Sequence, residues 1–190
     1  MKTLLIVAGV AVVLLLLNAG CAAVRGGYAT APYRVVRTDG KFQLRDYPDL
    51  VLVQTPMHGA DNSFLRLFHY IGGQNAAQQK ISMTTPVYMA KGETNGTMAF
   101  VLPATVPLAQ APAPAESGVT LAVRPAGRFA VLRFTGGISA RHETNALARL
   151  QTWATQQSLT VQGEPIYGYF DPPWTPPCFR RNEVMLRLAP

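Results

Sequence analysis

The amino-acid sequence predicts an α+β domain, in which a distorted antiparallel β-barrel of about eight strands carries two flanking α-helices. Two observations lead to this fold class. After residue 33 the hydrophobic pattern runs strand, strand, helix, strand, strand, and the same order then occurs a second time. Neither half has enough apolar residues to form a core alone, so the two halves are expected to form one domain.

The first half contains several strand signals. Residues 41–47 (KFQLRDY) alternate apolar and polar side chains, whereas residues 50–55 (LVLVQT) form the continuous apolar run of a buried strand. Further strands are expected at 80–89 and 97–103. One side of the last strand carries Met98, Phe100 and Leu102.

A helix is predicted between these strand pairs. Asp61 or Asn62 can cap its start, and Gly72-Gly73 closes its end. Its apolar stripe follows the i, i+3, i+4, i+7 spacing of one helix face and consists of Phe64, Leu67, Phe68 and Ile71.

The second half begins after a Pro/Ala-rich segment at 103–118, which is expected to be a long exposed loop. Strands are predicted at 119–125, 128–136, 165–170 and 182–188, and a helix at 139–157. The inward-facing strand residues are Ala130, Leu132, Phe134, Val184, Leu186 and Leu188. The helix has Ser139 as its cap and buries Ala146, Leu147, Leu150, Trp153 and Ala154.

Residues 1–20 are typical of a secretory signal peptide, because Lys2 precedes the apolar run Leu4–Leu17 and small residues lead to Cys21. The run is too short for a comfortable membrane span. The order Leu-Asn-Ala-Gly-Cys resembles a bacterial lipobox, in which Cys21 is lipidated and anchors the protein to a membrane. Asn18 departs from that pattern, and the alternatives are a plain cleaved signal or an uncleaved anchor.

Two further expectations follow from a lipidated cysteine. Residues 21–32, which are small and Gly/Ala-rich, form a tether, and residues 33–190 form the folded domain. Ala22 follows the cysteine instead of an aspartate, which by resemblance to enterobacterial sorting favours the periplasmic side of the outer membrane. Cys178 then has no partner for an internal disulfide.

Composition and motifs exclude several functions. The formal charge is +7, but the sequence has no run of basic residues interleaved with aromatic ones, so nucleic-acid binding is not predicted. Gly-rich phosphate loops, His-x-x-x-His, Cys-x-x-Cys and Gly-x-Ser-x-Gly are absent from the sequence. The histidines His58, His69 and His142 are isolated, with His69 expected to face solvent, so no metal site and no catalytic residue is predicted. The sequence makes no prediction of oligomeric state.

Methionines and carboxylates in the predicted strands are the remaining chemical signals. The methionines fill either the core or a soft apolar pocket for a flat ligand, and they are Met83, Met89, Met98 and Met185. Asp46 and Glu183 interrupt strand patterns. A buried carboxylate must be paired, and Arg180 or Arg181 could supply the charge.

Three blocks of the chain resemble the SOUL haem-binding protein family. They are FQLRDYPDLVLVQT (42–55), FLRLFHYIGGQNAAQQKISMTTPV (64–87) and YFDPPWTPPCFRRNEVML (169–186). The segment Lys80–Val87 is similar to the family pattern K-I-x-M-T-x-P-V, and the resemblance covers about residues 33–188. It implies a distorted antiparallel barrel of two similar halves, related to small-molecule-sensing domains of the GyrI-like type, over the ligand-binding domain 33–190.

The resemblance also implies binding of haem or a related tetrapyrrole in an apolar groove beside a helix, with arginines near the propionates. Asp46 stands where some members have a histidine proposed as the axial ligand, so iron coordination there is not expected. The expected function is an envelope-anchored tetrapyrrole-binding protein without catalysis. Its expected ligand-binding residues are Phe64, Phe68, Met83, Met98, Trp174, Arg180 and Arg181.

Two alternatives belong to other functional classes. One is a binding module for other small apolar or cationic molecules, as the GyrI-like fold suggests. The other is an enzyme that hydrolyses a tetrapyrrole or removes its metal, with Asp46, Glu183 and Tyr169 as candidates.

The proline-rich segment near the C-terminus is predicted to be a stiff corner. Prolines at 172, 173, 176 and 177 fix φ and remove backbone donors, so they cannot lie inside a sheet. The corner presents Trp174, enters the last strand at Arg180 and positions Arg181 and Glu183. Cys178 is expected to be a small core residue, with a thiolate ligand to iron as the alternative.

Overall fold

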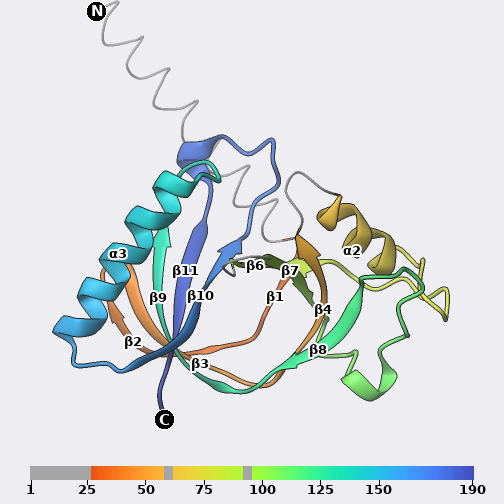
Figure 1. Ribbon diagram of the computed structural model, residues 1–190, viewed down its shortest axis with the longest axis horizontal. Helices are drawn as coiled ribbons and strands as arrows, with labels where there is room; N and C mark the ends of the chain where they lie inside the picture. The colour runs from red at the N-terminus through yellow and green to blue at the C-terminus, as the bar shows by residue number, and fades with distance from the viewer. Residues whose placement is uncertain (1–26, 58–61, 92–95) are drawn as a thin grey trace, which may run out of the picture.

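The structure is a computed structural model that describes residues 27–57, 62–91 and 96–190. Its centre is a curved, antiparallel, nine-stranded sheet (Figure 1). In spatial order the strands are β2 (Arg34–Asp39), β3 (Phe42–Tyr47), β9 (Gly127–Phe134), β11 (Asn182–Leu188), β10 (Val161–Tyr169), β6 (Val87–Ala90), β7 (Gly96–Val101), β4 (Leu50–Met57) and β8 (Thr120–Arg124). The helices are α2 (Ser63–Ile71) and α3 (Ala140–Gln156), with short 3-10 turns η1 (Leu108–Gln110) and η2 (Pro177–Phe179).

The α+β class and the antiparallel sheet are confirmed, but the predicted barrel is not closed. β2 and β8 form the two edges of the sheet and do not pair with each other. All residues of β2 are exposed, so this strand has no buried face that would draw it across to β8. The sheet therefore curves strongly and stays open.

The two halves exchange their first strands. The first half consists of β3, β4, α2, β6 and β7, and the second consists of β8, β9, α3, β10 and β11. β3 pairs with β9 of the second half, β8 pairs with β4 of the first half, and the halves meet where β10 pairs with β6. Because each half completes the sheet of the other, neither can form its core alone.

Alternation along the strands creates two different faces. One face packs on both helices, with Leu132 and Val184 beneath α3 and Phe100 beneath α2. We call the other side of the sheet the helix-free face, and its core includes Tyr47 and Phe129. Figure 1 shows α3 and α2 towards opposite ends of the sheet.

Helix α3 matches its prediction. The side chain of Ser139 accepts a hydrogen bond from the backbone N–H of His142, as an N-cap should. Leu150 and Trp153 are buried, and the Trp153 indole N–H donates to Asp39 at 2.8 Å. The pattern alone therefore placed both the start and the buried face of this helix.

Helix α2 is rotated relative to its prediction. Leu67 and Ile71 are buried as expected, but Phe64 and Phe68 are 44% and 48% exposed, and Tyr70 is buried in their place. The Tyr70 hydroxyl donates to the carbonyl of Pro112 at 2.8 Å. The Pro/Ala-rich loop thus covers the Tyr70 side of the helix and leaves the phenylalanines outside.

Several strands differ from the predictions in their bounds or their existence. The expected strand at 80–89 is divided into β5 (Thr84–Thr85) and β6, because Pro86 lacks a backbone donor, and Met83 precedes both. The last strand has the predicted bounds 182–188, but the corner leads into it two residues after Arg180, because η2 occupies the end of the corner. β2 was not predicted, since an edge strand with every residue exposed has no apolar alternation.

Two predictions concern single segments. Cys178 is exposed on η2, so the expectation of a small core residue is wrong. Lys2 and Cys21 lie outside the described residues, as does His58. The described end of the expected tether is held by the domain, because β1 (Ala29–Thr30) pairs with β5 and Ala31 is buried.

No helix in the described part of the chain is long and apolar enough to cross a membrane.

The orientation of α2 can be tested with two substitutions. Leu67→Ala is expected to lower the free energy of unfolding by about 2–5 kcal/mol, because it leaves a cavity in the core. Phe68→Ala, one residue further along the helix, is expected to cost about 1 kcal/mol or less, because the ring is half exposed. Urea denaturation measures both values. Similar losses in the two variants would contradict the observed orientation.

Candidate functional site

Helix α2 carries an exposed aromatic surface at the border of the core. The rings of Phe64 and Phe68 are stacked, with centroids 6.0 Å apart and planes 15° from parallel. Phe64 also meets Phe100 edge-on, at a centroid distance of 5.2 Å. We call the exposed pair Phe64 and Phe68 the aromatic ledge. It offers two nearly parallel, solvent-accessible rings on a rigid helix.

Two of the predicted methionines, Met83 and Met98, lie in the core beneath α2. Met98 is buried in the same cluster as Phe100, and Met83 is half-buried against that cluster. Phe100 therefore connects the ledge to Met98. The structure brings these sequence-predicted residues into one region, although the methionines serve mainly as packing there.

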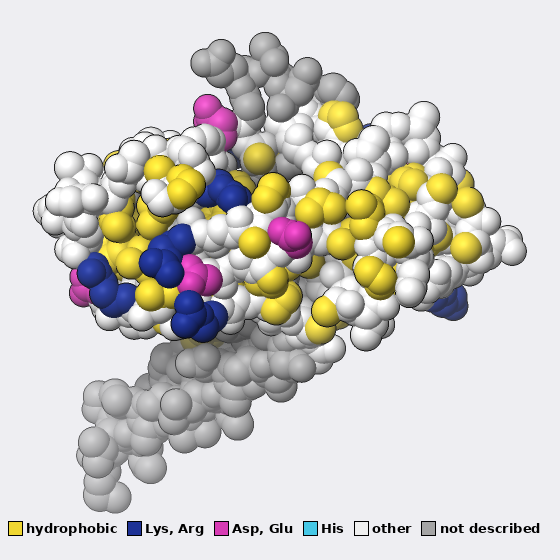
Figure 2. Space-filling model, turned by 90° about the horizontal axis from the view of Figure 1, so that it is seen from below, with side chains coloured by type: hydrophobic (Ala, Val, Ile, Leu, Met, Phe, Trp, Pro, Cys, Tyr) yellow, Lys and Arg dark blue, Asp and Glu magenta, His cyan; other side chains and the backbone are white. Residues whose placement is uncertain are grey.

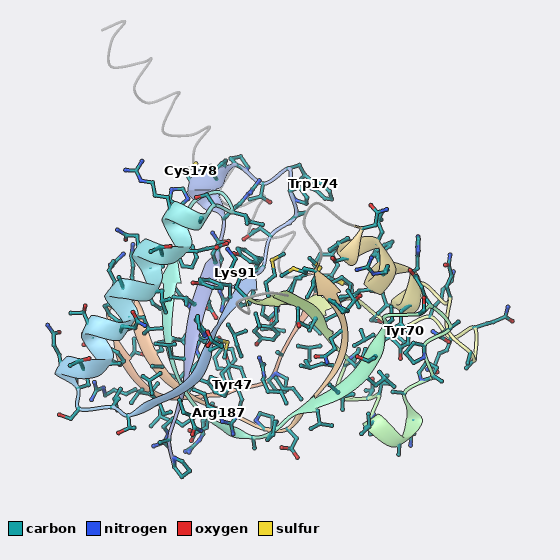
Figure 3. The ribbon with its side chains drawn as sticks, viewed as in Figure 1. Tyr47, Tyr70, Lys91, Trp174, Cys178 and Arg187 are labelled. Carbon is teal, nitrogen blue, oxygen red and sulfur yellow. The ribbon has the colours of Figure 1, made fainter. Side chains whose placement is uncertain are left out.

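The predicted residues of the proline corner lie elsewhere. Trp174 is 78% exposed and points away from the sheet (Figure 3), and among the described residues no ring contact joins it to the ledge. Arg180 donates to the backbone carbonyls of Thr175, at 2.7 Å, and Pro173. Both residues therefore belong to the corner itself.

Arg181 belongs to a cluster on the helix-free face that the sequence did not reveal. We call it the arginine–tyrosine cluster. Its members are Tyr33, Arg45, Tyr47, Tyr88, Arg124, Phe129, Arg133, Arg181 and Glu183. Tyr33, which follows β1, lies over Arg45, with its ring centroid 4.2 Å from the guanidinium carbon. The N-terminal segment therefore covers part of this face.

Glu183 is the single carboxylate of the cluster. It is 2% exposed, and fully buried Arg45 donates to both of its oxygens, at 2.7 and 2.9 Å. Arg181 and Arg133 donate to it as well, at 2.7 and 3.1 Å. The expectation that a buried Glu183 needs an arginine is confirmed for Arg181, but it missed Arg45. In the alternating pattern of β3, Arg45 lies among the polar residues, so burial was not expected. The only sequence signal for burial was that Arg45 lies on the same side of the strand as Tyr47.

The cluster carries an excess of positive charge. Four guanidiniums, those of Arg45, Arg124, Arg133 and Arg181, accompany the one carboxylate. Arg124 lies 4.1 Å from the Tyr88 ring centroid, and its buried Nε and Nη2 have no hydrogen-bond acceptor among the described residues. This face is therefore suited to an anionic or neutral aromatic group and opposes a cation.

Basic side chains are also concentrated elsewhere on the surface. On the underside of the molecule, Lys and Arg side chains gather on one half, while hydrophobic side chains spread over the other (Figure 2). Asp46 is held in exposed ion pairs by Arg128, at 2.7 Å, and Arg34, at 2.8 Å. These arginines lower the pKa of Asp46 to about 2.

The other residues considered for catalysis are also engaged. The Tyr169 hydroxyl donates to buried Glu143, and burial together with this hydrogen bond raises the pKa of Tyr169. Lys91 forms an ion pair with the same Glu143. Burial raises the pKa of Tyr47 and Tyr88 too. The Tyr169 hydroxyl is therefore already engaged as a hydrogen-bond donor.

The described residues contain no group of three or more His, Cys, Asp or Glu side chains that could hold a metal ion. His69 and His142 are exposed and far apart in the chain, and the prediction that His69 faces solvent is confirmed.

Glu183→Gln tests the role of the buried carboxylate. Loss of its charge leaves Arg45 buried without a counterion, so the free energy of unfolding is expected to fall by about 3–5 kcal/mol. The matched control Asp46→Asn removes a carboxylate from exposed ion pairs and is expected to cost far less. Urea denaturation at pH 7 compares the two, and equal losses would show that Glu183 has no special structural role.

The pH dependence supplies a second readout. Burial raises the pKa of a carboxyl, but the hydrogen bonds and charges of Arg45 and Arg181 hold the pKa of Glu183 below its usual value. Such a group stabilises the fold above its unfolded pKa, and this contribution is lost as the pH falls through its folded pKa. The free energy of unfolding should therefore decline below about pH 4.5. Glu183→Gln should make this decline shallower, whereas Asp46→Asn should keep the part of the decline that Glu183 causes.

Solved structures with the same fold have very different sequences. A hydrolase from Listeria innocua superposes with a TM-score of 0.62 at 10% identity, covering 81% of this chain and 94% of that one. The C-terminal domain of EcmrR gives 0.57 at 12% identity, covering 83% and 98%. An uncharacterized conserved protein from Listeria innocua gives 0.59 at 12% identity, covering 78% and 92%. At these identities the likeness extends to the fold alone.

Sequence comparison identifies the family of the chain, although no curated protein matches it significantly. The family model described as SOUL heme-binding protein matches residues 28–187, from just before β1 to the last strand. The match includes the aromatic ledge, the arginine–tyrosine cluster and the proline corner. The chain belongs to the SOUL heme-binding protein family.

Proposed function

We propose that this protein binds haem or a related tetrapyrrole without catalysis, and that it does so while anchored to the bacterial envelope. The observation that carries the binding proposal is the aromatic ledge, which leaves two stacked rings exposed in a chain of a heme-binding family. A flat ligand laid on these rings buries apolar surface worth about 25 cal/mol per Å2 before the costs of association.

The corner arginines take a supporting part in this proposal. Arg180 would have to leave two backbone carbonyls to reach a propionate, and Arg181 would have to leave Glu183. We therefore assign ligand contact to Phe64 and Phe68, and a positioning role to the arginines. Asp46 is held by Arg34 and Arg128, so it would not be a ligand to the iron of a bound haem. A metal-free porphyrin is then expected to bind about as well as haem.

The two alternatives have less support. Small cationic molecules would be repelled by the excess positive charge of the arginine–tyrosine cluster, because its only carboxylate is already bound by three arginines. An enzyme would need a free acid or base, and Asp46, Glu183 and Tyr169 are all held by neighbouring residues. The hydrolase from Listeria innocua shares the fold at 10% identity, which carries no activity across.

The binding proposal is tested by Soret-band titration of the purified full-length protein with haemin. We expect a saturable spectral shift at micromolar concentrations and a similar affinity for protoporphyrin, followed by quenching of its fluorescence. Replacing both ledge residues, Phe64→Ala with Phe68→Ala, is expected to weaken binding about tenfold or more, because both stacking rings are lost.

The matched control is Leu108→Ala, which removes an exposed hydrophobic side chain far along the chain from the ledge. Unchanged affinity in the ledge variant would move the site away from α2. A wild-type protein that gives no saturable shift with either ligand would sink the binding proposal.

Envelope anchoring rests on the sequence of residues 1–21. Expression in a bacterial host with radiolabelled palmitate is expected to label the wild-type protein, to place it in the outer-membrane fraction and to leave Cys21→Ser unlabelled. Cys178→Ser, which removes the exposed cysteine, is the control and should remain labelled. Label in Cys21→Ser, or none in the wild type, would refute lipidation at this position.

A further inference from the structure

A second site lies beside α3, apart from the aromatic ledge. A cavity of about 460 Å3 opens there between the helix, the end of β9 and the β2–β3 turn. Its walls are formed by Lys41, Phe134, Thr135, Arg141, His142, Asn145, Ala146 and Arg149. Basic and polar side chains dominate this lining, and no acidic side chain belongs to it.

The regular spacing of α3 brings the basic residues together. Arg141, Asn145 and Arg149 follow one another at four-residue intervals, so their side chains line one face of the helix. Each interval advances about 6 Å along the axis. Lys41 joins them from the β2–β3 turn, where its backbone carbonyl accepts a hydrogen bond from Arg133 N–H. Cations from two separate segments thus surround one cavity.

These charges are not neutralised within the described part of the chain. None of Lys41, Arg141 and Arg149 forms an ion pair there. The nearest acidic residues in sequence are engaged elsewhere: buried Glu143 is bound by Lys91 and Tyr169, and Asp39 accepts the Trp153 indole hydrogen. The cavity therefore concentrates positive potential that has no internal counterion.

The position of His142 in the wall is fixed by its surroundings. Its Nδ1 lies 2.9 Å from the carbonyl oxygen of Gly137, so that nitrogen donates. A Cβ at Gly136 would come within 2.8 Å of the same Nδ1, and Gly136 has a φ of +124°, so glycine is needed for this close approach. The ring is thereby held in place, and its Nε2 is left for another partner.

We propose that this cavity binds a phosphate-bearing anion with more than one negative charge. Guanidiniums donate pairs of hydrogen bonds that match phosphate oxygens, and Lys41 supplies a further charge. Arg141 and Arg149 start about 12 Å apart along the helix, a span that suits two anionic groups better than one. Asn145 and Thr135 add neutral hydrogen-bond donors. The ligand is a soluble diphosphate or an array of lipid phosphate headgroups.

A tetrapyrrole does not fit this lining. Only Phe134 and Ala146 offer apolar contact, whereas a porphyrin needs an extended apolar surface. The two sites are therefore separate, and the phosphate site does not rest on the proposed tetrapyrrole function. If haemin does not bind, the phosphate proposal is unaffected. If phosphate does not bind, the proposal that the aromatic ledge binds a tetrapyrrole is unaffected.

The test compares two double variants of the full-length protein, each with two positive charges fewer. One is Arg141→Gln with Arg149→Gln, in the cavity. The other is Arg34→Gln with Lys80→Gln, which are exposed and outside it. The side chains of Arg141 and Arg149 form no ion pair with other described residues, so the cavity variant is expected to keep its melting temperature. Thermal denaturation by circular dichroism checks this.

Two binding measurements separate the sources of phosphate. Calorimetric titration with pyrophosphate probes the soluble form. Flotation with phosphatidylcholine vesicles, with and without phosphatidylglycerol, probes the headgroup, and the quantity compared is the gain that phosphatidylglycerol adds. The cavity variant is expected to lose about tenfold in affinity per guanidinium, in at least one of the two measurements, whereas the control variant keeps wild-type binding. Salt should weaken the interaction.

Loss confined to pyrophosphate identifies a soluble ligand, and loss confined to the phosphatidylglycerol gain identifies a lipid headgroup. The proposal is overturned if the cavity variant equals the control variant in both measurements, or if the wild-type protein responds to neither probe.

Discussion

The buried ion pair of Arg45 and Glu183 is the interaction on which the arrangement of the two halves depends. Arg45 comes from the first half and Glu183 from the last strand, and neither can be buried without the other. Both point to the helix-free face, where they lie on either side of β9. Their contact requires β3 to have crossed into the second half. The ion pair of Arg45 and Glu183 can therefore form only when the two halves have exchanged their first strands.

This pairing also decides the electrostatic character of the helix-free face. Glu183 is fully occupied by Arg45, Arg133 and Arg181, so the additional guanidinium of Arg124 leaves the face positive. The segment after β1 closes it further with Tyr33. The exposed aromatic pair of the ledge lies on the opposite side of the sheet, on α2. The two proposed sites, the aromatic ledge and the basic cavity at α3, both belong to the helix-covered side of the sheet.

Sequence reasoning succeeded where one element supplied the whole signal. Helix α3 has a capping serine and an apolar face, so its start and its buried side followed directly, and the helix-facing residues of β9 and β11 were also predicted. It failed where a distant segment decided the outcome. The Pro/Ala-rich loop turned α2 towards Tyr70, and a polar-looking arginine in β3 became the most buried cation in the cluster. The cavity at α3 was missed because Lys41 lies far from Arg141 in the chain.

The sequence by itself determined the α+β class, the order of the two helices and most of the strands, the chain's resemblance to its family, and the need of a buried Glu183 for an arginine. These properties depend on local periodicity, turn chemistry and motif order, which are written along the chain. Only the tertiary structure decided that the sheet stays open, that the halves exchange strands, and which aromatic rings and cations are exposed. Exposure depends on which distant segments cover a surface. Contacts between distant segments do not change the local hydrophobic pattern of either segment, so they cannot be predicted from that pattern.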